Sequence, residues 1–211
     1  MLVYESLAIL YRDEHLLVLD KPTGLLAVPG RGPDKQDCLT TRVQREFPTA
    51  LVVHRLDRDT SGAMVMALGP EAQSELNRQF RERQVEKWYQ AIVAGAGEVE
   101  SGVIDLPMRK DFDRPPRHCI DHEFGRPAVT HWRLVERVGE LARIELQPIT
   151  GRSHQLRLHL AHIGMPICGD PLYAPDAVRA MAARLQLHAW RIGFAHPKTA
   201  ERMEFAAPCP F

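Results

Sequence analysis

Residues 52–68 read VVHRLDRDTSGAMVMAL, a dense polar cluster between two apolar runs. Val52 and Val53 are typical of the end of a strand, and residues 64–68 are typical of a buried strand. The Asp, Thr, Ser and Gly residues between these runs favour a turn. Loops held between strands often carry reactive side chains. The stretch therefore predicts a strand–loop–strand unit that presents polar groups from a rigid frame.

Within this loop, Asp57 is the candidate reactive group. Arg55 and Arg58 flank it in the sequence, and nearby positive charge favours the ionised form of a carboxyl group. An ionised carboxylate in a partly dry site is a usable nucleophile. The same residues also suit a plain turn, in which Asp57, Asp59 and Thr60 only close the loop, and the residues alone leave both interpretations open.

The segments on either side predict many strands and few helices. Residues 7–12 and 15–19 favour a hairpin, and the repeat of Ala72, Leu76 and Phe80 indicates a helix over 70–84. Helices are also predicted at 39–46, from Ser153 as N-cap to Gly164, and near 176–184, and strands at 88–93, 128–136, 141–147 and 187–195. With no regular βαβ rhythm, these elements predict an α+β fold around a mixed, largely antiparallel sheet.

Length and composition suit a globular protein of one domain. The 211 residues fit one large domain or two small subdomains that share a core. No apolar run approaches the roughly 20 residues that span a bilayer. The start of the chain also lacks the pattern of a signal peptide. We therefore expect no membrane partner and a location in the cytoplasm.

Charge gives a mixed indication about nucleic acid. Lys plus Arg and Asp plus Glu both number 27, so the net charge is zero, whereas nucleic-acid-binding domains tend to be basic. Three basic groups would still form a groove if they met on one face, and are solvated surfaces otherwise. They are Arg78, Arg81, Arg83 and Lys87; Arg109, Lys110, Arg114 and Arg117; and Arg152, His154, Arg157 and His159.

Cysteines and histidines do not predict a metal site. The four cysteines are widely spaced and form no CxxC pair, which favours reduced structural thiols. The segment HCIDH at 118–122 lacks a second ligand pair at a familiar spacing. We expect no bound metal.

Five ordered segments resemble the RluA family of pseudouridine synthases. HRLDRDTSG at 54–62 is similar to the signature motif of the family, and DKPTGLLAVPG at 20–30 to its lysine–proline motif. Residues 78–95, 148–173 and 187–190 resemble its later motifs, so the likeness spans nearly the whole chain. The resemblance implies the pseudouridine synthase fold, in which two subdomains share one continuous curved mixed sheet with flanking helices and a central RNA-binding cleft.

The same resemblance implies a single catalytic domain over residues 1–211 without an S4 domain. The lysine–proline motif begins at Lys21, which leaves no room before it for that RNA-binding domain. It also implies a cofactor-independent isomerase, because the uracil leaves the ribose, rotates and rejoins through carbon with no redox change or group transfer. We expect a monomer.

Roles for single residues follow from the motif positions. Asp57 matches the essential aspartate that acts as the N-glycosidic bond breaks. Tyr89 matches a tyrosine whose ring stacks on the base and whose hydroxyl is a candidate for proton transfer, and Arg157 an arginine that pairs with the aspartate. Without the family, the plain interpretations are a strand-core tyrosine and a helix-surface arginine.

The remaining matches concern RNA binding. Arg55 matches a residue that enters the RNA stack where the target leaves. Either Leu158 or Leu160 is a candidate wall of the uracil pocket, although both also suit plain core. The other RNA-binding candidates are Lys21, His54, Arg152 and His154.

The substrate is expected to be a compact RNA stem-loop. Isomerisation needs access to both N1 and C5 of the uracil, so the nucleotide must flip out of its stack, and loop bases are the usual targets. The short family members without an S4 domain imply dual specificity for a uridine in a tRNA anticodon loop and one in a hairpin of large-subunit ribosomal RNA. At Arg58-Asp59 the chain is more similar to other branches, which leaves a single ribosomal target as the alternative.

Two other classes of function remain as alternatives. A non-catalytic RNA-binding module would keep the basic groove without needing Asp57 or Tyr89. A hydrolase would use Asp57 with His54 or His154, but the sequence has neither a nucleophile elbow nor a two-carboxylate design. Release of tritium from the C5 position of uridine in RNA separates the isomerase from both.

Overall fold

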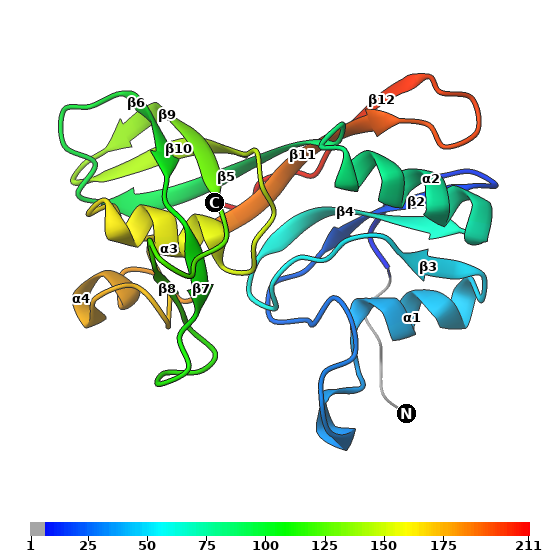
Figure 1. Ribbon diagram of the computed structural model, residues 1–211, viewed down its shortest axis with the longest axis horizontal. Helices are drawn as coiled ribbons and strands as arrows, with labels where there is room; N and C mark the ends of the chain where they lie inside the picture. The colour runs from blue at the N-terminus through cyan, green and yellow to red at the C-terminus, as the bar shows by residue number, and fades with distance from the viewer. Residues whose placement is uncertain (1–6) are drawn as a thin grey trace. The chain divides into compact units, whose positions relative to one another are not determined.

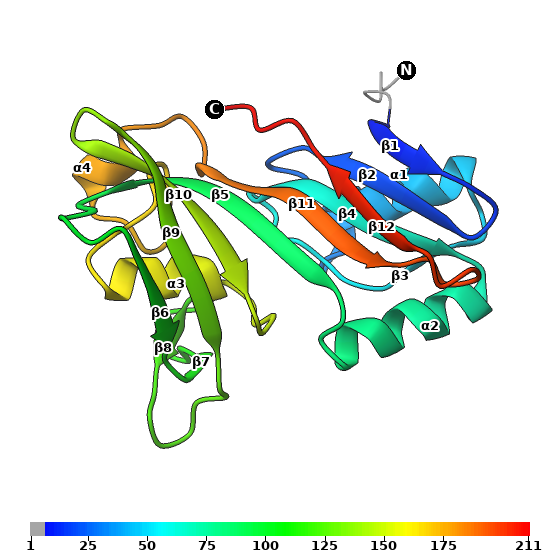
Figure 2. The ribbon, with the colours of Figure 1, turned by 90° about the horizontal axis from the view of Figure 1, so that it is seen from above.

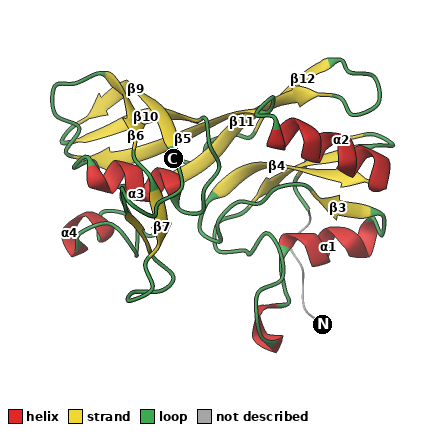
Figure 3. Ribbon diagram, viewed as in Figure 1, coloured by secondary structure: helices red, strands yellow, loops and turns green. Residues whose placement is uncertain are grey.

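The computed structural model describes residues 7–211, which divide into two compact units. The first comprises the chain up to Glu86 together with Ala189–Pro210, and the second comprises Lys87–His188 and Phe211. The chain passes between them inside two strands, β5 (Glu86–Ala94) and β11 (Leu187–Ala195). Strands outnumber helices in both units (Figure 3), so the predicted α+β class is confirmed.

The first unit is built on antiparallel strand pairs. Strand β2 (Leu16–Lys21) pairs with β1 (Ile9–Arg12) and with β4 (Ser61–Leu68). Strand β3 (Ala50–Val52) also pairs with β4, and β12 (Arg202–Ala206) pairs with β11, as Figure 2 shows.

Two helices cover these strands because each has an apolar side. Helix α2 (Pro70–Arg81) lies beside β4 and α1 (Leu39–Glu46) beside β3 (Figure 1). Leu76 of α2 is fully buried in one core with Leu16, Val65 and Phe194. A short 3₁₀ turn, η1 (Pro33–Lys35), precedes α1. Burial of such apolar side chains is the main favourable contribution to folding.

Gly62 allows close packing at the start of β4. Its φ is +114°, and a Cβ atom there would lie 2.2 Å from the carbonyl oxygen of Ala189 in β11. No L-amino acid fits that conformation and that contact together. The glycine at the end of the HRLDRDTSG motif is therefore needed for the packing of β4 against β11.

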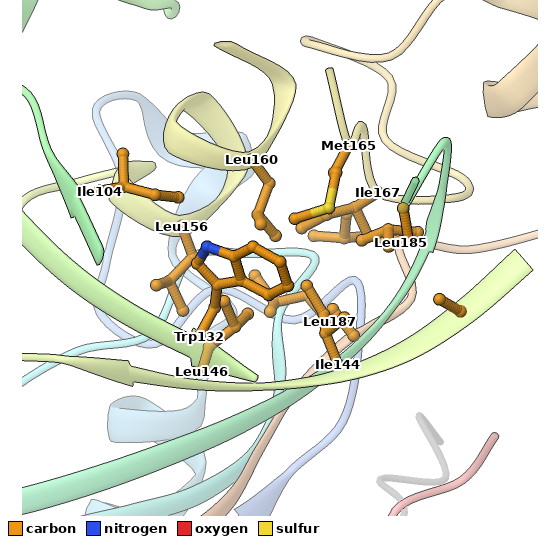
Figure 4. Close-up of a cluster of buried hydrophobic side chains, with 14 residues drawn as sticks. Ile104, Trp132, Ile144, Leu146, Leu156, Leu160, Met165, Ile167, Leu185 and Leu187 are labelled. Carbon is orange, nitrogen blue, oxygen red and sulfur yellow. The ribbon is translucent and has the colours of Figure 1, made fainter. Parts of the chain in front are cut away.

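The second unit has a four-stranded sheet in the order β5–β10–β9–β6 and a separate hairpin. The elements new to this unit are β6 (Ser101–Asp105), β9 (Val129–Val138), β10 (Leu141–Pro148), the hairpin strands β7 (Met108–Lys110) and β8 (His118–Ile120), and the helices α3 (Gln155–His162) and α4 (Asp176–Arg179). Figure 4 shows the indole of Trp132 from β9 among Leu156 and Leu160 of α3 and Leu146 of β10. This core fixes α3 against one face of the sheet.

Most predicted elements are present, two predictions are wrong and four strands were missed. Ser153 is not the N-cap of α3: that position is His154, at φ 59°, because the Gln155 side chain binds both the Arg152 N–H and the Thr150 hydroxyl and tightens the preceding turn. Helix α4 ends at Arg179 rather than 184, because the chain turns inward to bury Leu185. Strands β6, β7, β8 and β12 were not predicted.

Two broader expectations have different outcomes. The prediction that two subdomains share one sheet as a single domain stays a prediction. Among residues 7–211, no helix is both long and apolar enough to cross a membrane.

Candidate active site

The signature motif lies in the loop between β3 and β4, which we call the Asp57 loop (residues 53–60). Its backbone is fixed from the neighbouring lysine–proline segment. The Lys21 ammonium donates to the carbonyl oxygens of Pro22 at 2.8 Å, Leu25 at 2.7 Å and Arg58 at 2.9 Å. The Thr23 hydroxyl donates to the carbonyl oxygen of Asp59 at 2.7 Å. The two residues after Asp57 are thus anchored through their backbone.

Lys21 requires a correction, because it was predicted to bind RNA. Its side chain is 0% exposed. An ammonium group has three N–H donors, and the three carbonyl bonds use all of them. A buried charge is tolerated when it is hydrogen-bonded in this way. Lys21 therefore supports the Asp57 loop and does not offer its ammonium to a phosphate.

His54 also holds the loop, at its first turn. The Val65 N–H of β4 donates to Nε2 of His54 at 3.0 Å, and the ring stacks on Phe80 of α2 at 4.6 Å between centroids. Because Nε2 accepts this bond, the neutral ring carries its proton on Nδ1. The predicted RNA contact of His54 stays a prediction, and Nε2 is already used within the protein.

Asp57 itself is half-buried at the exposed side of this anchored turn. Arg55 is exposed. The guanidinium of Arg58 is 61% exposed and pairs with Asp59 at 2.9 Å. Within residues 7–86 and 189–210 the structure gives the Asp57 carboxylate no hydrogen bond or ion pair. The arginine that follows Asp57 is therefore directed to the next aspartate instead.

In the second unit, Tyr89 and α3 lie on the same face of the sheet. Tyr89 stands in β5 opposite Leu146 of β10. It is half-buried and packs against the core cluster that contains Leu156 and Leu160 of α3. Leu160 is 0% exposed in this cluster, whereas Leu158 packs beside Met108 and Tyr173. Leu160 is thus plain core, and only Leu158 remains a candidate pocket wall.

Arg157 is not a helix-surface arginine, because it is paired inside the second unit. Its Nε donates to Asp170 Oδ2 at 2.8 Å and its Nη2 to Asp170 Oδ1 at 2.6 Å. The two side chains are only 2% and 1% exposed. The guanidinium carbon also lies 5.4 Å from the centre of the Tyr173 ring. This two-bond geometry fixes both the position and the plane of the guanidinium.

His154 belongs to the same group of side chains. Its Nδ1 lies 2.8 Å from the Tyr173 hydroxyl, and its ring meets the edge of His118 at 5.1 Å. We call His154, Arg157, Asp170 and Tyr173 the Asp170 cluster. Arg152, three residues before Gln155, is half-buried and donates from Nε to the carbonyl oxygen of Pro127 at 3.2 Å. The RNA contacts of Arg152 and His154 stay predictions.

The predicted site residues therefore fall into two groups. Lys21, His54, Arg55 and Asp57 belong to the Asp57 loop and its support, and Tyr89, Arg152, His154 and Arg157 to the second unit. The predicted pairing of Arg157 with Asp57 would join the two groups, and it stays a prediction. Sequence reasoning missed Asp170, Tyr173 and Thr23, although all three lie inside the quoted motifs.

Each of the three basic groups contains at least one arginine that pairs with a carboxylate. Arg78 pairs with Glu75 and Glu82. In the hairpin region, Arg109 pairs with Asp121. The Phe124 N–H and then Arg109 lower the pKa of Asp121 to about 2. Arg114 also pairs with Asp111. These contacts show why a zero net charge and local runs of basic residues occur together.

His159, in the third basic group, is also internal. It is 0% exposed and lies 3.0 Å from both the Thr130 hydroxyl and the Leu106 carbonyl oxygen. A carbonyl only accepts, so Nε2 carries the proton and Nδ1 accepts from Thr130. Burial lowers the pKa of His159 below its ordinary value. His159 is therefore a neutral structural group rather than part of a basic groove.

Within residues 7–211, no group of three or more His, Cys, Asp or Glu side chains is arranged to hold a metal ion. His118 of the HCIDH segment instead packs against His154.

Comparison with known proteins agrees with this arrangement. A sequence profile described as RNA pseudouridylate synthase matches residues 15–162. The dual-specificity RNA pseudouridine synthase RluA of Escherichia coli (strain K12) is 48% identical over 206 residues, which are 97% of this chain and 94% of that protein. Its namesake from Yersinia pestis is 47% identical over 204 residues, 96% and 99% of the two chains.

A solved structure extends the likeness to three dimensions. Human RNA pseudouridylate synthase domain containing 1 superposes with a TM-score of 0.82 at 30% sequence identity. The match covers 98% of this chain and 85% of the human chain.

Proposed function

The chain belongs to the family of RNA pseudouridylate synthases, and on that premise we propose that it isomerises uridines in two RNAs. The targets are a uridine in a tRNA anticodon loop and a uridine in a hairpin of large-subunit ribosomal RNA. The observation that carries this proposal is the identity of 47–48% over nearly the whole chain to relatives described as dual-specificity enzymes. These substrates place the enzyme in the cytoplasm, where it acts as a monomer.

The reaction needs no external group. The bond between N1 of uracil and C1′ of the ribose breaks, the base rotates, and a bond forms between C5 and C1′. The C5 proton leaves to solvent and N1 takes up a proton, so substrate and product are isomers. Because no electron or group is gained or lost, the reaction requires neither a redox cofactor nor a group carrier.

Asp57 is the catalytic carboxylate in this proposal. Support comes from its motif and from the anchors that Lys21 and Thr23 place on the next two residues. A catalytic group must be held in place by its surroundings while its own reactive atoms stay accessible. A half-buried carboxylate on an anchored turn meets that requirement. Tyr89 stacks on the flipped base, and Arg157 pairs with Asp57.

Recognition is proposed to rest on the RNA backbone and on the shape of the loop. Arg55 is exposed beside Asp57, so it can enter the stack that the target nucleotide leaves, and His54 lies at the start of the same loop. Arg152 and His154 supply further contacts from the second unit. Phosphate contacts make affinity fall with salt, with a log–log slope of about 0.7 per phosphate for single strands. A flat salt dependence would contradict these contacts.

The test of catalysis is a matched pair of variants in one loop. Asp57→Asn keeps the size of the side chain but removes the ionised oxygen. Asp59→Asn makes the same change two residues away, at a side chain that pairs with Arg58. We expect tritium release from C5-tritiated RNA to fall to background for Asp57→Asn and to stay within a few-fold of wild type for Asp59→Asn. Both variants should be folded and should bind RNA.

The test of dual specificity uses isolated RNAs and cells. An anticodon stem-loop and a ribosomal hairpin should both release tritium with the purified enzyme. Carbodiimide mapping should show that both pseudouridines are lost on deletion of the gene and recovered when it is restored. If only the ribosomal hairpin reacts, the single-target alternative is correct, and binding without tritium release supports the RNA-binding module.

A further inference from the structure

Asp170, unlike Asp57, has no direct role in the proposed reaction. It is 1% exposed. Its Oδ2 accepts from Arg157 Nε, and its Oδ1 accepts from Arg157 Nη2 and from the backbone N–H groups of Leu172 at 2.7 Å and Tyr173 at 3.1 Å. A carboxylate has about four acceptor positions. Three of the four donors converge on Oδ1 and one reaches Oδ2, and at 1% exposure the carboxylate is not open to a substrate.

The two backbone bonds place the Tyr173 side chain. They fold residues 170–173 into a turn, and from that turn the Tyr173 hydroxyl reaches both the His118 N–H at 2.8 Å and His154 Nδ1 at 2.8 Å. An N–H can only donate, so the hydroxyl accepts from His118. When the hydroxyl directs its own proton to His154, Nδ1 is the acceptor and the neutral ring carries its proton on Nε2.

We propose that Asp170 is a positioning residue of the active site, and that its one carboxylate sets two side chains of the proposed site. It fixes the guanidinium plane of Arg157 directly, and it fixes the ring of His154 through the turn and Tyr173. This inference rests on the proposed function, because it assigns Arg157 to the chemical step and His154 to RNA contact. The left-handed conformation of His154, at φ 59°, is uncommon for a residue with a side chain, and its ring lies within hydrogen-bond distance of the Tyr173 hydroxyl.

Two substitutions separate the effect of Asp170 on Arg157 from its effect on His154. In Asp170→Asn, Oδ1 still accepts from Leu172 and Tyr173, but the amide NH₂ opposes Arg157 Nε and the charge is lost. In Tyr173→Phe, the ring stays over Arg157, and the hydroxyl bonds to His154 and to the His118 N–H are removed. The first change acts on Arg157, and the second acts on His154 and on the backbone at His118.

The measurements are the single-turnover rate of tritium release and the RNA Kd of folded protein, with folding checked by circular dichroism. Asp170→Asn should lower the rate on the order of tenfold to a hundredfold, as expected when a reacting geometry is misplaced, with Kd within about twofold of wild type. Tyr173→Phe should weaken RNA binding and leave the single-turnover rate at saturating enzyme near wild type. In ¹⁵N NMR, Nδ1 of His154 should be unprotonated in the wild type.

A double-mutant cycle distinguishes positioning from a general structural role. In an Arg157→Met background, Asp170→Asn should cost less than about twofold further in rate, because residues that act through one another are not additive. An equal loss in both backgrounds would overturn the proposal. If Asp170→Asn does not fold, Arg157→Lys replaces it, since a lysine cannot form the two-bond pair and should lose rate to the same degree. An unchanged rate in that variant would also overturn the proposal.

Failure of this inference can be separated from failure of the proposed function. If the wild type releases no tritium from any RNA, the proposed function is wrong. If the wild type is active and Asp170→Asn is equally active, only the positioning role is wrong. If Nδ1 of His154 is protonated in the wild type, the proposed positioning of His154 through Tyr173 is wrong.

Discussion

The Asp57 loop and the Asp170 cluster each contain an aspartate with arginine nearby, and the two aspartates are held in different ways. Around Asp57, the backbone is fixed by Lys21 and Thr23 while the carboxylate stays half-buried. In the Asp170 cluster, the carboxylate itself is fixed by four donors and is 1% exposed. The first arrangement leaves the carboxylate open for a reaction, and the second encloses it among donors that support the surrounding residues.

The comparison also shows that neighbours in sequence are poor guides to ion pairs. Arg58 follows Asp57 directly but pairs with Asp59. Arg157 pairs with Asp170, thirteen residues further along the chain. An arginine next to an aspartate in the sequence does not necessarily point toward it. The turn at 170–173, in contrast, brings the Asp170 carboxylate to Arg157 of α3. Four substitutions or conditions test how far this contrast holds.

The largest effect on stability is expected at Arg157. Arg157→Met leaves the buried carboxylate of Asp170 without its cation, which should lower the free energy of unfolding by about 3–5 kcal/mol. Asp57→Asn should change it by less than about 1 kcal/mol, because Asp57 has no such partner in its unit. Urea denaturation of both variants gives the comparison, and equal stabilities would show that the two aspartates do not differ as described.

The next effect is expected at the support of the Asp57 loop. Lys21→Met removes the donor for three carbonyl oxygens and should lower the free energy of unfolding by about 2–3 kcal/mol. The tritium-release rate should fall more than the RNA affinity, because the loop moves while no phosphate contact is lost. Lys35→Met, at an exposed lysine of the same unit, is the control. A Lys21 variant with weaker RNA binding and a normal rate would restore the original RNA-binding prediction.

A smaller effect concerns pH and the second unit. Burial lowers the pKa of His159 below 6.5 in the folded protein, so the unfolded chain binds the proton more readily. The stability that neutral His159 contributes is fully present above the ordinary histidine pKa. As pH falls from that value through the lowered pKa, this stability is lost at up to about 1.4 kcal/mol per pH unit. His159→Gln should flatten the fall in stability below that pH. The same change at exposed His122 of the same unit is the control, and an identical slope in both variants would contradict the prediction.

The smallest effect is expected at the exposed pair beside Asp57. Arg58→Ala removes the ion pair with Asp59 and should change the free energy of unfolding by less than about 0.5 kcal/mol, as is usual for exposed pairs. A double-mutant cycle with Asp59→Ala measures the coupling directly. A coupling as large as that of Arg157 with Asp170 would show that exposure does not separate the two pairs.

Much of the fold could be predicted because local patterns are strong where apolar residues repeat. The helix at 39–46 and the strand at 187–195 have the predicted bounds. Strands β7 and β8 are three residues each, too short for an alternating pattern to emerge among the basic and proline residues around them. The N-cap of α3 was misplaced because the side chain of Gln155, not a capping hydroxyl, organises that turn.

The candidate site was predictable in its residue positions and less so in its contacts. Asp57, Tyr89 and Arg157 were found through motif resemblance, but burial of Lys21 depends on three carbonyl oxygens that tertiary folding assembles. The pairing of Arg78 is different: Glu75 and Glu82 lie three and four residues away on one helix face, a spacing that predicts ion pairs. The sequence therefore contained a signal that Arg78 is paired within its own helix.

The discontinuity of the first unit has a consequence for synthesis on the ribosome. The second unit is one continuous segment apart from Phe211, whereas the first needs Ala189–Pro210 to join residues made more than a hundred positions earlier. Phe194 and Ile192 complete the core around Leu16 and Val65, and they are made only after the continuous segment Lys87–His188 of the second unit. Contacts between distant parts of a chain form slowly, and chains fold from the N-terminus as they are made. The second unit can therefore fold first. Until β11 is made, the apolar side chains of β2 and β4 lack the residues that complete their core.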